Sequence, residues 1–253
     1  MSFMNKVVLV TGGSTGIGAV TAEQFAKEGA SVAIVGRNEA GLKAVAQRCE
    51  KHGAPTLIIK ADVAKDEEAK TIVKQTVEKF GKLDVLVNNA AILKNTLLTD
   101  PDVMQTYDDV LGINLRAVVH LTSLAAPYLA KTKGNIINIS SILAKTYVQT
   151  SQLMMYCTSK AALNHFTHGA ALELAASGVR VNIVSPGPVR TNMLQGLVTD
   201  KIWEDNANAT ALQRISEPEE VADVIMFLGV IYETTKPLNL NSPRGLYFFL
   251  EKP

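Results

Sequence analysis

The chain has 253 residues, of which 47% are hydrophobic and 19% are charged. This composition predicts a folded globular protein rather than a disordered one. The formal net charge is +1, so no basic surplus indicates binding to nucleic acid or to an anionic membrane surface. Its apolar runs are too short for a membrane span, which needs about 20 residues, and residues 1–6 lack the features of a signal segment.

Cysteine and histidine usage argues against a disulfide framework and against a metal site. The two cysteines, Cys49 and Cys157, lie far apart in the sequence and form no metal-ligand spacing. His165 and His168 are three residues apart in an expected helix, where a helix surface or a satisfied core is the ordinary interpretation. We expect a cytoplasmic protein without a metal.

In chain order, short runs rich in Val, Ile and Leu alternate with longer helical stretches. Strands are expected at residues 6–10, 31–35, 56–60, 83–87, 135–139 and 179–184. Helices are expected at 17–28, 38–52, 66–80, 103–131, 156–176 and 217–228, with Pro127 interrupting the fourth of them. Such alternation predicts an α/β fold, a Rossmann-type doubly wound parallel sheet with helices on both faces.

No linker or composition shift divides the chain, so residues 1–253 are expected to form a single domain. Residues 191–212 lie between a strand and a helix and include several apolar side chains. A loop of that length is often a lid over a site, and we expect a substrate lid here.

The first strand is followed by a glycine-rich stretch that predicts a phosphate-binding loop. Gly12 allows a tight turn, Gly16 allows the backbone to approach a pyrophosphate, and Gly18 allows the next helix to pack closely on the sheet. The N–H groups and dipole of that helix then favour an anion. The expected cofactor-binding residues of this loop are Gly12, Ser14, Thr15, Gly16, Ile17 and Gly18.

The end of the second strand indicates which dinucleotide is bound. An acid there would bind the ribose 2′-hydroxyl of NAD, but the chain has Gly36, Arg37 and Asn38. Arg37 can pair with a 2′-phosphate, although a solvated arginine at a helix start is the ordinary alternative. NADP(H) is therefore preferred over NAD(H).

Tyr156 and Lys160 are spaced four residues apart at the start of an expected helix. Residues i and i+4 share one helix face, so the phenol and the ammonium can reach the same ligand. A free tyrosine has a pKa near 10, and a neighbouring ammonium should lower that pKa toward the range useful for proton transfer.

Taken together, the ordered motifs of residues 6–228 resemble those of the short-chain dehydrogenase/reductase family. The motifs are Thr11-Gly12-xxx-Gly16-x-Gly18, Asp62-Val63, Asn88-Asn89-Ala90-Ala91, Asn114, Ser140-Ser141, Tyr156-xxx-Lys160 and Ser185-Pro186-Gly187-Pro188-Val189-Arg190-Thr191. Each is unremarkable alone, but their joint order and spacing are typical of this family.

The resemblance implies a role for each matching residue. Tyr156 would be the general acid in reduction or the base in oxidation, Lys160 would hold the nicotinamide ribose, and Ser141 would hydrogen-bond the substrate oxygen. Asn114 would help to hold a water that links Lys160 to solvent. Further cofactor contacts are implied for Asp62, Val63, Asn88, Ala90, Pro186, Gly187, Val189 and Thr191.

Two departures from the family pattern stand out. The interval from Ser141 to Tyr156 is slightly longer than in many members, which leaves the choice between Ser140 and Ser141 open. The usual Asp-Gly-Gly ending is missing, and residues 229–253 form an atypical tail. Residues 245–250 can supply a seventh strand by their β-propensity, or else act as an exposed interaction segment.

The substrate pocket is expected to be apolar, which favours a hydrophobic ketone, aldehyde or alcohol that is steroid-, retinoid-, terpenoid- or acyl-like. Its expected lining is Ile92, Leu93, Ile142, Leu143, Leu153, Met154, Met193, Leu194, Leu197 and Trp203. An NADPH-dependent carbonyl reductase is the first hypothesis. A 3-oxoacyl thioester reductase and a non-catalytic dinucleotide-binding partner protein are the alternatives. The resemblance also implies a homo-tetramer or homo-dimer through the long helices near 103–131 and 156–176.

Overall fold

The structure is a computed structural model of the chain, and it describes residues 2–146, 151–194, 199–230 and 247–249. Its described strands form one seven-stranded sheet in the order β3-β2-β1-β4-β5-β6-β7, and every neighbouring pair is parallel. The strands are β1 Val7–Thr11, β2 Ser31–Gly36, β3 Thr56–Lys60, β4 Val85–Asn88, β5 Asn135–Ile139, β6 Arg180–Ser185 and β7 Tyr247–Phe249. The chain order reverses between β1 and β4, which is where such sheets bind ligands.

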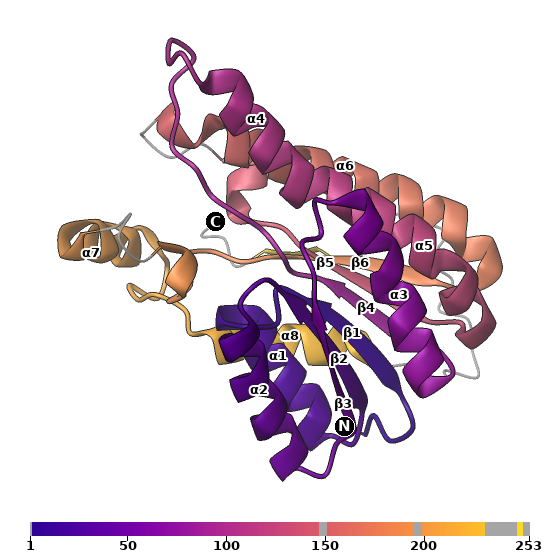
Figure 1. Cartoon of the computed structure of the whole chain (residues 1–253). Coiled ribbons are helices and arrows are strands. Elements are labelled where there is room, and N and C mark those ends of the chain that lie inside the picture. The colour runs from indigo at the N-terminus through magenta and orange to yellow at the C-terminus, as the bar shows by residue number, and fades with distance from the viewer. Residues whose placement is uncertain (1, 147–150, 195–198, 231–246, 250–253) are drawn as a thin grey trace.

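Helices cover both faces of this sheet (Figure 1). The α-helices are α1 Gly16–Lys27, α2 Glu39–Lys51, α3 Asp66–Phe80, α4 Val103–Leu111, α5 Ala117–Thr132, α6 Met154–Leu174, α7 Asp200–Ala209 and α8 Pro218–Gly229. One layer contains α1, α2 and α8, and the other contains α3, α5 and α6. A π-helical turn, Gly112–Arg116, joins α4 to α5, whereas α7 lies apart from both layers.

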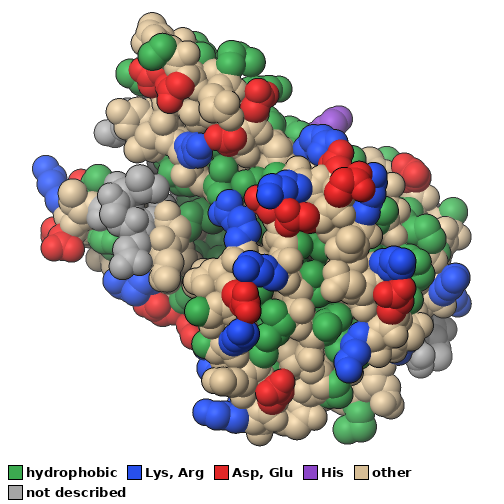
Figure 2. Space-filling view, viewed as in Figure 1, with side chains coloured by type: hydrophobic (Ala, Val, Ile, Leu, Met, Phe, Trp, Pro, Cys, Tyr) green, Lys and Arg blue, Asp and Glu red, His purple; other side chains and the backbone are tan. Residues whose placement is uncertain are grey.

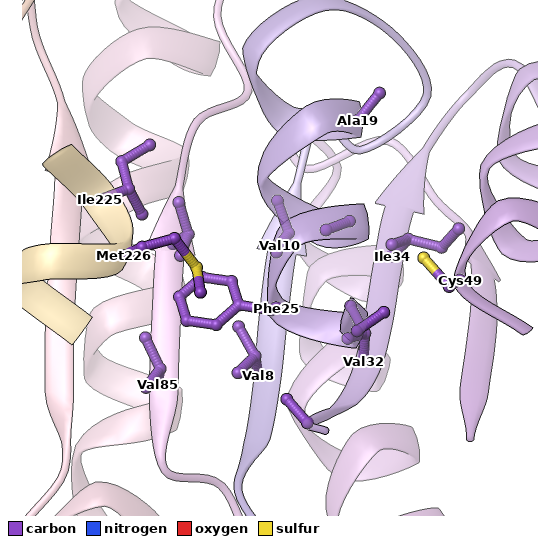
Figure 3. Close-up of a cluster of buried hydrophobic side chains, with 14 of the residues drawn as sticks. Val8, Val10, Ala19, Phe25, Val32, Ile34, Cys49, Val85, Ile225 and Met226 are labelled. Atoms are coloured by element: carbon purple, nitrogen blue, oxygen red, sulfur yellow. The ribbon is translucent and has the colours of Figure 1, made fainter. Parts of the chain in front are cut away.

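The two layers exist because the strands are apolar on both faces. Alternate residues of β1 point to opposite faces of the sheet and join two different hydrophobic cores. Val8 and Val10 belong to the core shared with α1 and α8, and Val7 and Leu9 belong to the core shared with α3 and α5. In Figure 3 the fully buried Phe25 of α1 lies over the strands, with a methionine of α8 beside its ring. The sheet is thus fixed by apolar burial from above and below.

The doubly wound parallel sheet expected from the sequence is confirmed. The expected interruption at Pro127 is wrong, because α5 runs through Pro127 as far as Thr132. Burial of Leu121, Ala125 and Leu129 on the sheet side of α5 offsets the hydrogen bond that a proline removes. The tail does supply a short edge strand, β7, which pairs in parallel with β6.

The helical stretch of residues 103–132 is long and apolar enough to cross a membrane, judged by length and composition alone. The sequence does not suggest this, because the uninterrupted apolar runs in the chain are short. The buried side chains of α5, however, belong to the core cluster that covers the sheet. This is the packing of a core helix, and core helices can also be long and apolar enough to meet the length and composition criterion for a membrane span.

We predict that Leu121→Ala lowers the free energy of unfolding by about 2–5 kcal/mol, because Leu121 is buried in the core and its loss leaves a cavity. Urea unfolding measures this change. Leu212→Ala is the matched control, since Leu212 between α7 and α8 is 73% exposed and should change the value by no more than about 0.5 kcal/mol. Equal effects of the two substitutions would contradict the described packing.

Candidate active site

The glycine loop between β1 and α1 is so tightly packed that Gly12 and Gly18 have no room for a Cβ atom. Gly12 has a φ of +64°, and a Cβ on Gly18 would lie 2.4 Å from the Gly12 carbonyl oxygen. The Asn89 side chain closes the loop from the β4 side, because its Nδ2 donates to the oxygens of Thr11 and Gly12 at 2.9 and 3.2 Å. The result is a rigid turn at the N-terminus of α1, where free N–H groups and the helix dipole attract an anion.

A second side of this loop is formed by residues distant in sequence. A Cβ on Gly16, whose φ is +55°, would lie 3.2 Å from the Cγ2 of Thr191. Ser14 lies beside Gly36 at the end of β2. Thr15 is the N-cap residue of α1, and Ile17 packs against the core. These surroundings form a cradle that added Cβ atoms would obstruct, and they fit a dinucleotide pyrophosphate.

At the end of β2 the structure places Arg37 near Asp62, with 3.9 Å between the guanidinium and the carboxylate. Arg37 is 65% exposed, so its guanidinium can turn toward a ligand. Asp62 Oδ1 also accepts from the backbone N–H of Ala64, while Val63 is buried in the core. The first acid after β2 is Glu39, which is engaged by Lys43 and Lys60.

The β4 end shows which asparagine reaches the glycine loop. Asn88 points into the sheet and donates to Asn138 Oδ1 at 2.8 Å, whereas Asn89 contacts the loop. Thr11 Oγ1 accepts from the N–H groups of Asn89 and Ala90, each at 3.0 Å. The motifs contain Thr11 and Asn89 but imply no role for either, and the only available signals are that Thr11 directly precedes Gly12 and that Asn89 follows Asn88 at the end of a strand.

Tyr156 and Ser141 meet where α6 begins and β5 ends. The Ser141 side chain hydrogen-bonds the Tyr156 phenol, and both residues are 8% exposed. Burial raises the pKa of Tyr156 to about 12, and the hydrogen bond from Ser141 acts in the opposite direction. The expected lowering of this pKa is therefore wrong for the described arrangement, because desolvation of a phenolate outweighs the other effects.

Lys160 lies below the phenol on the same helix face. Its Nζ is 5.7 Å from the centre of the Tyr156 ring and donates to the Ile139 carbonyl oxygen at 2.8 Å. Burial lowers the pKa of Lys160 to about 7, because a charged ammonium loses hydration that one carbonyl does not replace. A lysine with such a pKa exchanges its proton near neutral pH.

The structure separates the two candidate serines. Ser140 Oγ donates to Asn164 Oδ1 at 2.6 Å and therefore faces the middle of α6. Ser141 Oγ instead accepts from the Leu143 N–H at 3.1 Å and hydrogen-bonds Tyr156. Of the two, only Ser141 is placed beside the phenol.

Asn114 is fully buried in the π-helical turn between α4 and α5. Its carboxamide accepts from the N–H of Ile92 at 2.8 Å and donates to the Ile92 oxygen at 2.9 Å. It also donates to Ser159 Oγ, which lies next to Lys160 in the sequence. Asn114 thus fastens the loop after β4 to the helix that carries Tyr156.

The segment after β6 connects the region around Ser141 and Tyr156 with the glycine loop. Ile142 donates from its backbone to the Pro186 oxygen at 3.0 Å and lies beside Gly187, while Thr191 reaches Gly16. Residues 186–191 therefore run from Ser141 to the glycine loop, as a site for a nicotinamide requires. The Val189 side chain is buried in the core, which leaves only its backbone for such a contact.

The expected substrate side chains border this region without being buried. Ile92, Leu93, Leu143, Leu153 and Met154 are half-buried, and Thr96 joins their two loops by donating to the Gln152 oxygen at 3.0 Å. Met193 is 37% exposed, and Leu197 lies outside the described residues. Figure 2 shows the face hollowed between the α4 end and the side that carries α1 and α2, with hydrophobic side chains in the hollow.

The described residues of the segment where a lid is expected, 191–194 and 199–212, include a short 3₁₀ turn and α7. The two ends of this segment are clamped together, because Arg190 donates to the Ser216 oxygen at 2.9 Å and Ser216 to the Pro188 oxygen at 3.1 Å. No described residue of α7 is buried. Trp203 of α7 lies over the Arg190 guanidinium at 5.7 Å, beside an open cavity of about 510 Å³. The residues that line this cavity come from 190–217 and do not include Tyr156.

A glycine cradle for a dinucleotide beside a buried Ser–Tyr–Lys group defines an NAD(P)-dependent oxidoreductase that acts on CH–OH groups. A family model described as short chain dehydrogenase matches residues 6–202. The chain therefore belongs to the short-chain dehydrogenase/reductase family, as the motifs indicate.

Relatives and solved structures are similar over most of the chain. An L-fucose dehydrogenase of Mus musculus is 36% identical and covers 90% of this chain and 83% of its own. A 3-oxoacyl-[acyl-carrier-protein] reductase of Staphylococcus epidermidis is 36% identical and covers 96% and 100%. A crystal structure of a short chain dehydrogenase from Burkholderia cenocepacia in complex with NADP is 33% identical, covers 99% of both chains and has a TM-score of 0.88.

We predict that the buried Lys160 makes stability rise with pH. Its pKa is about 7 in the folded chain and about 10.4 when unfolded, so between these values the unfolded chain binds the extra proton. The free energy of unfolding should therefore gain up to about 1.4 kcal/mol per pH unit from Lys160 above pH 7. Urea unfolding of the wild type and of Lys160→Met from pH 7 to 9 measures this contribution, and parallel curves for the two proteins would refute it.

Proposed function

We propose that the chain is an NADPH-dependent carbonyl reductase that converts a hydrophobic ketone or aldehyde to an alcohol, or catalyses the reverse. The observation that carries this proposal is the hydrogen bond of Ser141 to the buried Tyr156 phenol, with Lys160 beneath it. At neutral pH the raised pKa of Tyr156 keeps its proton on the phenol, which is the state that reduction requires.

The glycine cradle and residues 186–191 would hold the dinucleotide so that its nicotinamide supplies a hydride, and so two electrons, to a carbonyl carbon. The Ser141 hydroxyl polarises the substrate oxygen and holds it near the phenol. Tyr156 Oη then gives its proton to that oxygen, which completes the alcohol. Lys160 Nζ, with a pKa near neutrality, is suited to return a proton toward the phenol.

The substrate class rests on the residues that border Tyr156. They are apolar and half-buried, and Met154 adapts easily to irregular shapes. Such a lining favours steroid-, retinoid-, terpenoid- or acyl-like carbonyls over charged ones.

The preference for NADPH is supported by the charges at the end of β2. Arg37 is exposed and free to turn, while the carboxylate of Glu39 is shared between Lys43 and Lys60. A free carboxylate for the ribose hydroxyls of NADH is therefore lacking among the described residues that directly follow β2. A 2′-phosphate would meet positive charge instead.

A 3-oxoacyl thioester reductase is the second candidate, because a relative of that activity matches along its whole length. A carrier protein is acidic and would need a basic docking face. Three of the four lysines of α3 and its N-cap are paired with acids of the same helix, at Lys65–Glu68, Lys70–Glu67 and Lys74–Glu78, which supports a solvated face instead. The non-catalytic hypothesis predicts dinucleotide binding without turnover.

We propose a cytoplasmic homo-tetramer or homo-dimer that uses the long helices as its contact surface. Val119 on α5 and Leu172 on α6 support this assembly, since they are apolar and 40% and 62% exposed. The two buried free cysteines, Cys49 and Cys157, agree with a reducing compartment.

We predict that Tyr156→Phe lowers reduction at least about 100-fold, because the proton donor is removed. The measurement is NADPH and NADH oxidation with decanal, 2-decanone, a 3-oxosteroid and acetoacetyl-N-acetylcysteamine, with L-fucose oxidation as the reverse reaction. Tyr128→Phe on α5 is the matched control and should keep the wild-type rate. Full activity of Tyr156→Phe would rule out the mechanism, whereas dinucleotide binding without turnover of any compound by the wild type would favour the non-catalytic protein.

We predict that Arg37→Ser raises the KM for NADPH at least about tenfold, since a charge-assisted hydrogen bond contributes about 1.5–3 kcal/mol. The KM for NADH should stay within about twofold. Arg48→Ser is the control, because Arg48 pairs with Glu23 away from the loop. An equal rise for both cofactors would show that Arg37 does not read the 2′-phosphate.

A further inference from the structure

The contact between β5 and α6 contains a line of polar links. Lys160 Nζ donates to the Ile139 oxygen at 2.8 Å, and Ser140 Oγ donates to Asn164 Oδ1 at 2.6 Å. Farther along, Asn138 Nδ2 donates to Thr167 Oγ1 at 2.9 Å. The last two residues of β5 and the residue that follows the strand are thus each tied to α6.

The hydrogen bond between Ser140 and Asn164 involves the residue directly before Ser141, whose hydroxyl contacts the Tyr156 phenol. Ser140 is only 4% exposed, and its hydroxyl also lies 3.4 Å from the Lys160 oxygen. Its backbone N–H completes the pairing with β6 by donating to the Val184 oxygen at 2.7 Å. Ser141 follows in extended conformation, with φ −161° and ψ 156°, so a rotation at Ser140 displaces the Ser141 hydroxyl.

Ser141 is held from the side that follows it by two backbone groups, because the Leu143 N–H donates to its Oγ and the Ile142 N–H donates to the Pro186 oxygen. After Ser141 come a single 3₁₀ turn, Ile142–Ala144, and the interval to Tyr156 that is longer than in many family members. Side-chain hydrogen bonds also tie the residues before Ser141 to α6, at Ile139 and Ser140. The geometry of the Ser141–Tyr156 hydrogen bond therefore depends on attachments on both sides of Ser141, including the links at residues 139 and 140.

We propose that Asn164 is a positioning residue of the active site. Its Oδ1 holds the Ser140 hydroxyl, and thereby keeps Ser141 at hydrogen-bond distance from the Tyr156 phenol. A displacement of about 1 Å at a reacting group can cost about 100-fold in rate, so losing this acceptor should reduce turnover. The inference rests on the proposed function, because it assigns Asn164 to the same site.

The chain offers a matched control in the neighbouring link. Thr167→Val removes the acceptor of the Asn138–Thr167 hydrogen bond, and Asn164→Leu removes the acceptor of the Ser140–Asn164 bond. Both variants lose a hydrogen bond between α6 and the end of β5, and Thr167→Val also loses the bond from its Oγ1 to the Leu163 oxygen. A purely structural role therefore predicts at least as large an effect for Thr167→Val as for Asn164→Leu. A positioning role predicts that only Asn164→Leu affects the chemistry.

The experiment measures kcat and the KM for NADPH with whichever carbonyl of the panel the wild type reduces fastest. Asn164→Leu should lower kcat about 10- to 100-fold with an unchanged KM for NADPH, and Asn164→Asp, which keeps an acceptor oxygen, should restore most of kcat. Thr167→Val should lower the unfolding temperature but keep kcat. In a double-mutant cycle that combines Asn164→Leu with Ser140→Ala, the kcat of the double variant should be no lower than that of the slower single variant, because both substitutions remove the same hydrogen bond.

Two results would overturn the proposal: a kcat loss in Thr167→Val at least as large as that in Asn164→Leu, or losses that multiply in the double variant. Crystal structures of both variants give a second readout that needs no turnover. The Ser141 hydroxyl should move away from the Tyr156 phenol in Asn164→Leu and stay in place in Thr167→Val. An unmoved Ser141 refutes the positioning role, whereas a moved Ser141 in a protein without reductase activity leaves positioning intact and refutes the proposed function.

Discussion

The docking of α6 on β5 is the contact on which the candidate site depends. Tyr156 and Lys160 come from the helix, and Ser141 comes from the end of the strand, so any shift between these two elements separates the phenol from the serine. Apolar burial holds the rest of the sheet, but it is non-directional and tolerates small displacements. Hydrogen bonds between α6 and β5 add the directional restraint that the site needs.

The sequence predicted the doubly wound sheet, and it contains the motifs that the structure brings together, because both depend on local signals. The strand runs, the glycine spacing after β1 and the four-residue interval from Tyr156 to Lys160 are all visible in the chain itself. What it could not predict depends on partners distant in the sequence. The choice of Ser141 over Ser140 depends on Asn164, and the role of Asn89 depends on the turn at Gly12.

Burial also explains two expectations that local reasoning missed. A lysine near a tyrosine lowers the phenol pKa in water-like surroundings, but in the described site desolvation dominates the pKa of both groups. Pro127 disfavours a helix in isolation, yet the apolar face of α5 holds it on the sheet. In both cases the tertiary environment outweighs the intrinsic property of the residue.

Two backbone hydrogen bonds between residues 188–190 and Ser216 join the two ends of the segment that contains α7. Both ends of the segment are fixed by backbone hydrogen bonds, which do not depend on the side chains between them, and α7 contributes no buried residue. Evolution can therefore lengthen, shorten or replace this segment with little effect on folding. The hydrogen bonds between α6 and the end of β5 lie outside this segment, so such changes leave them in place.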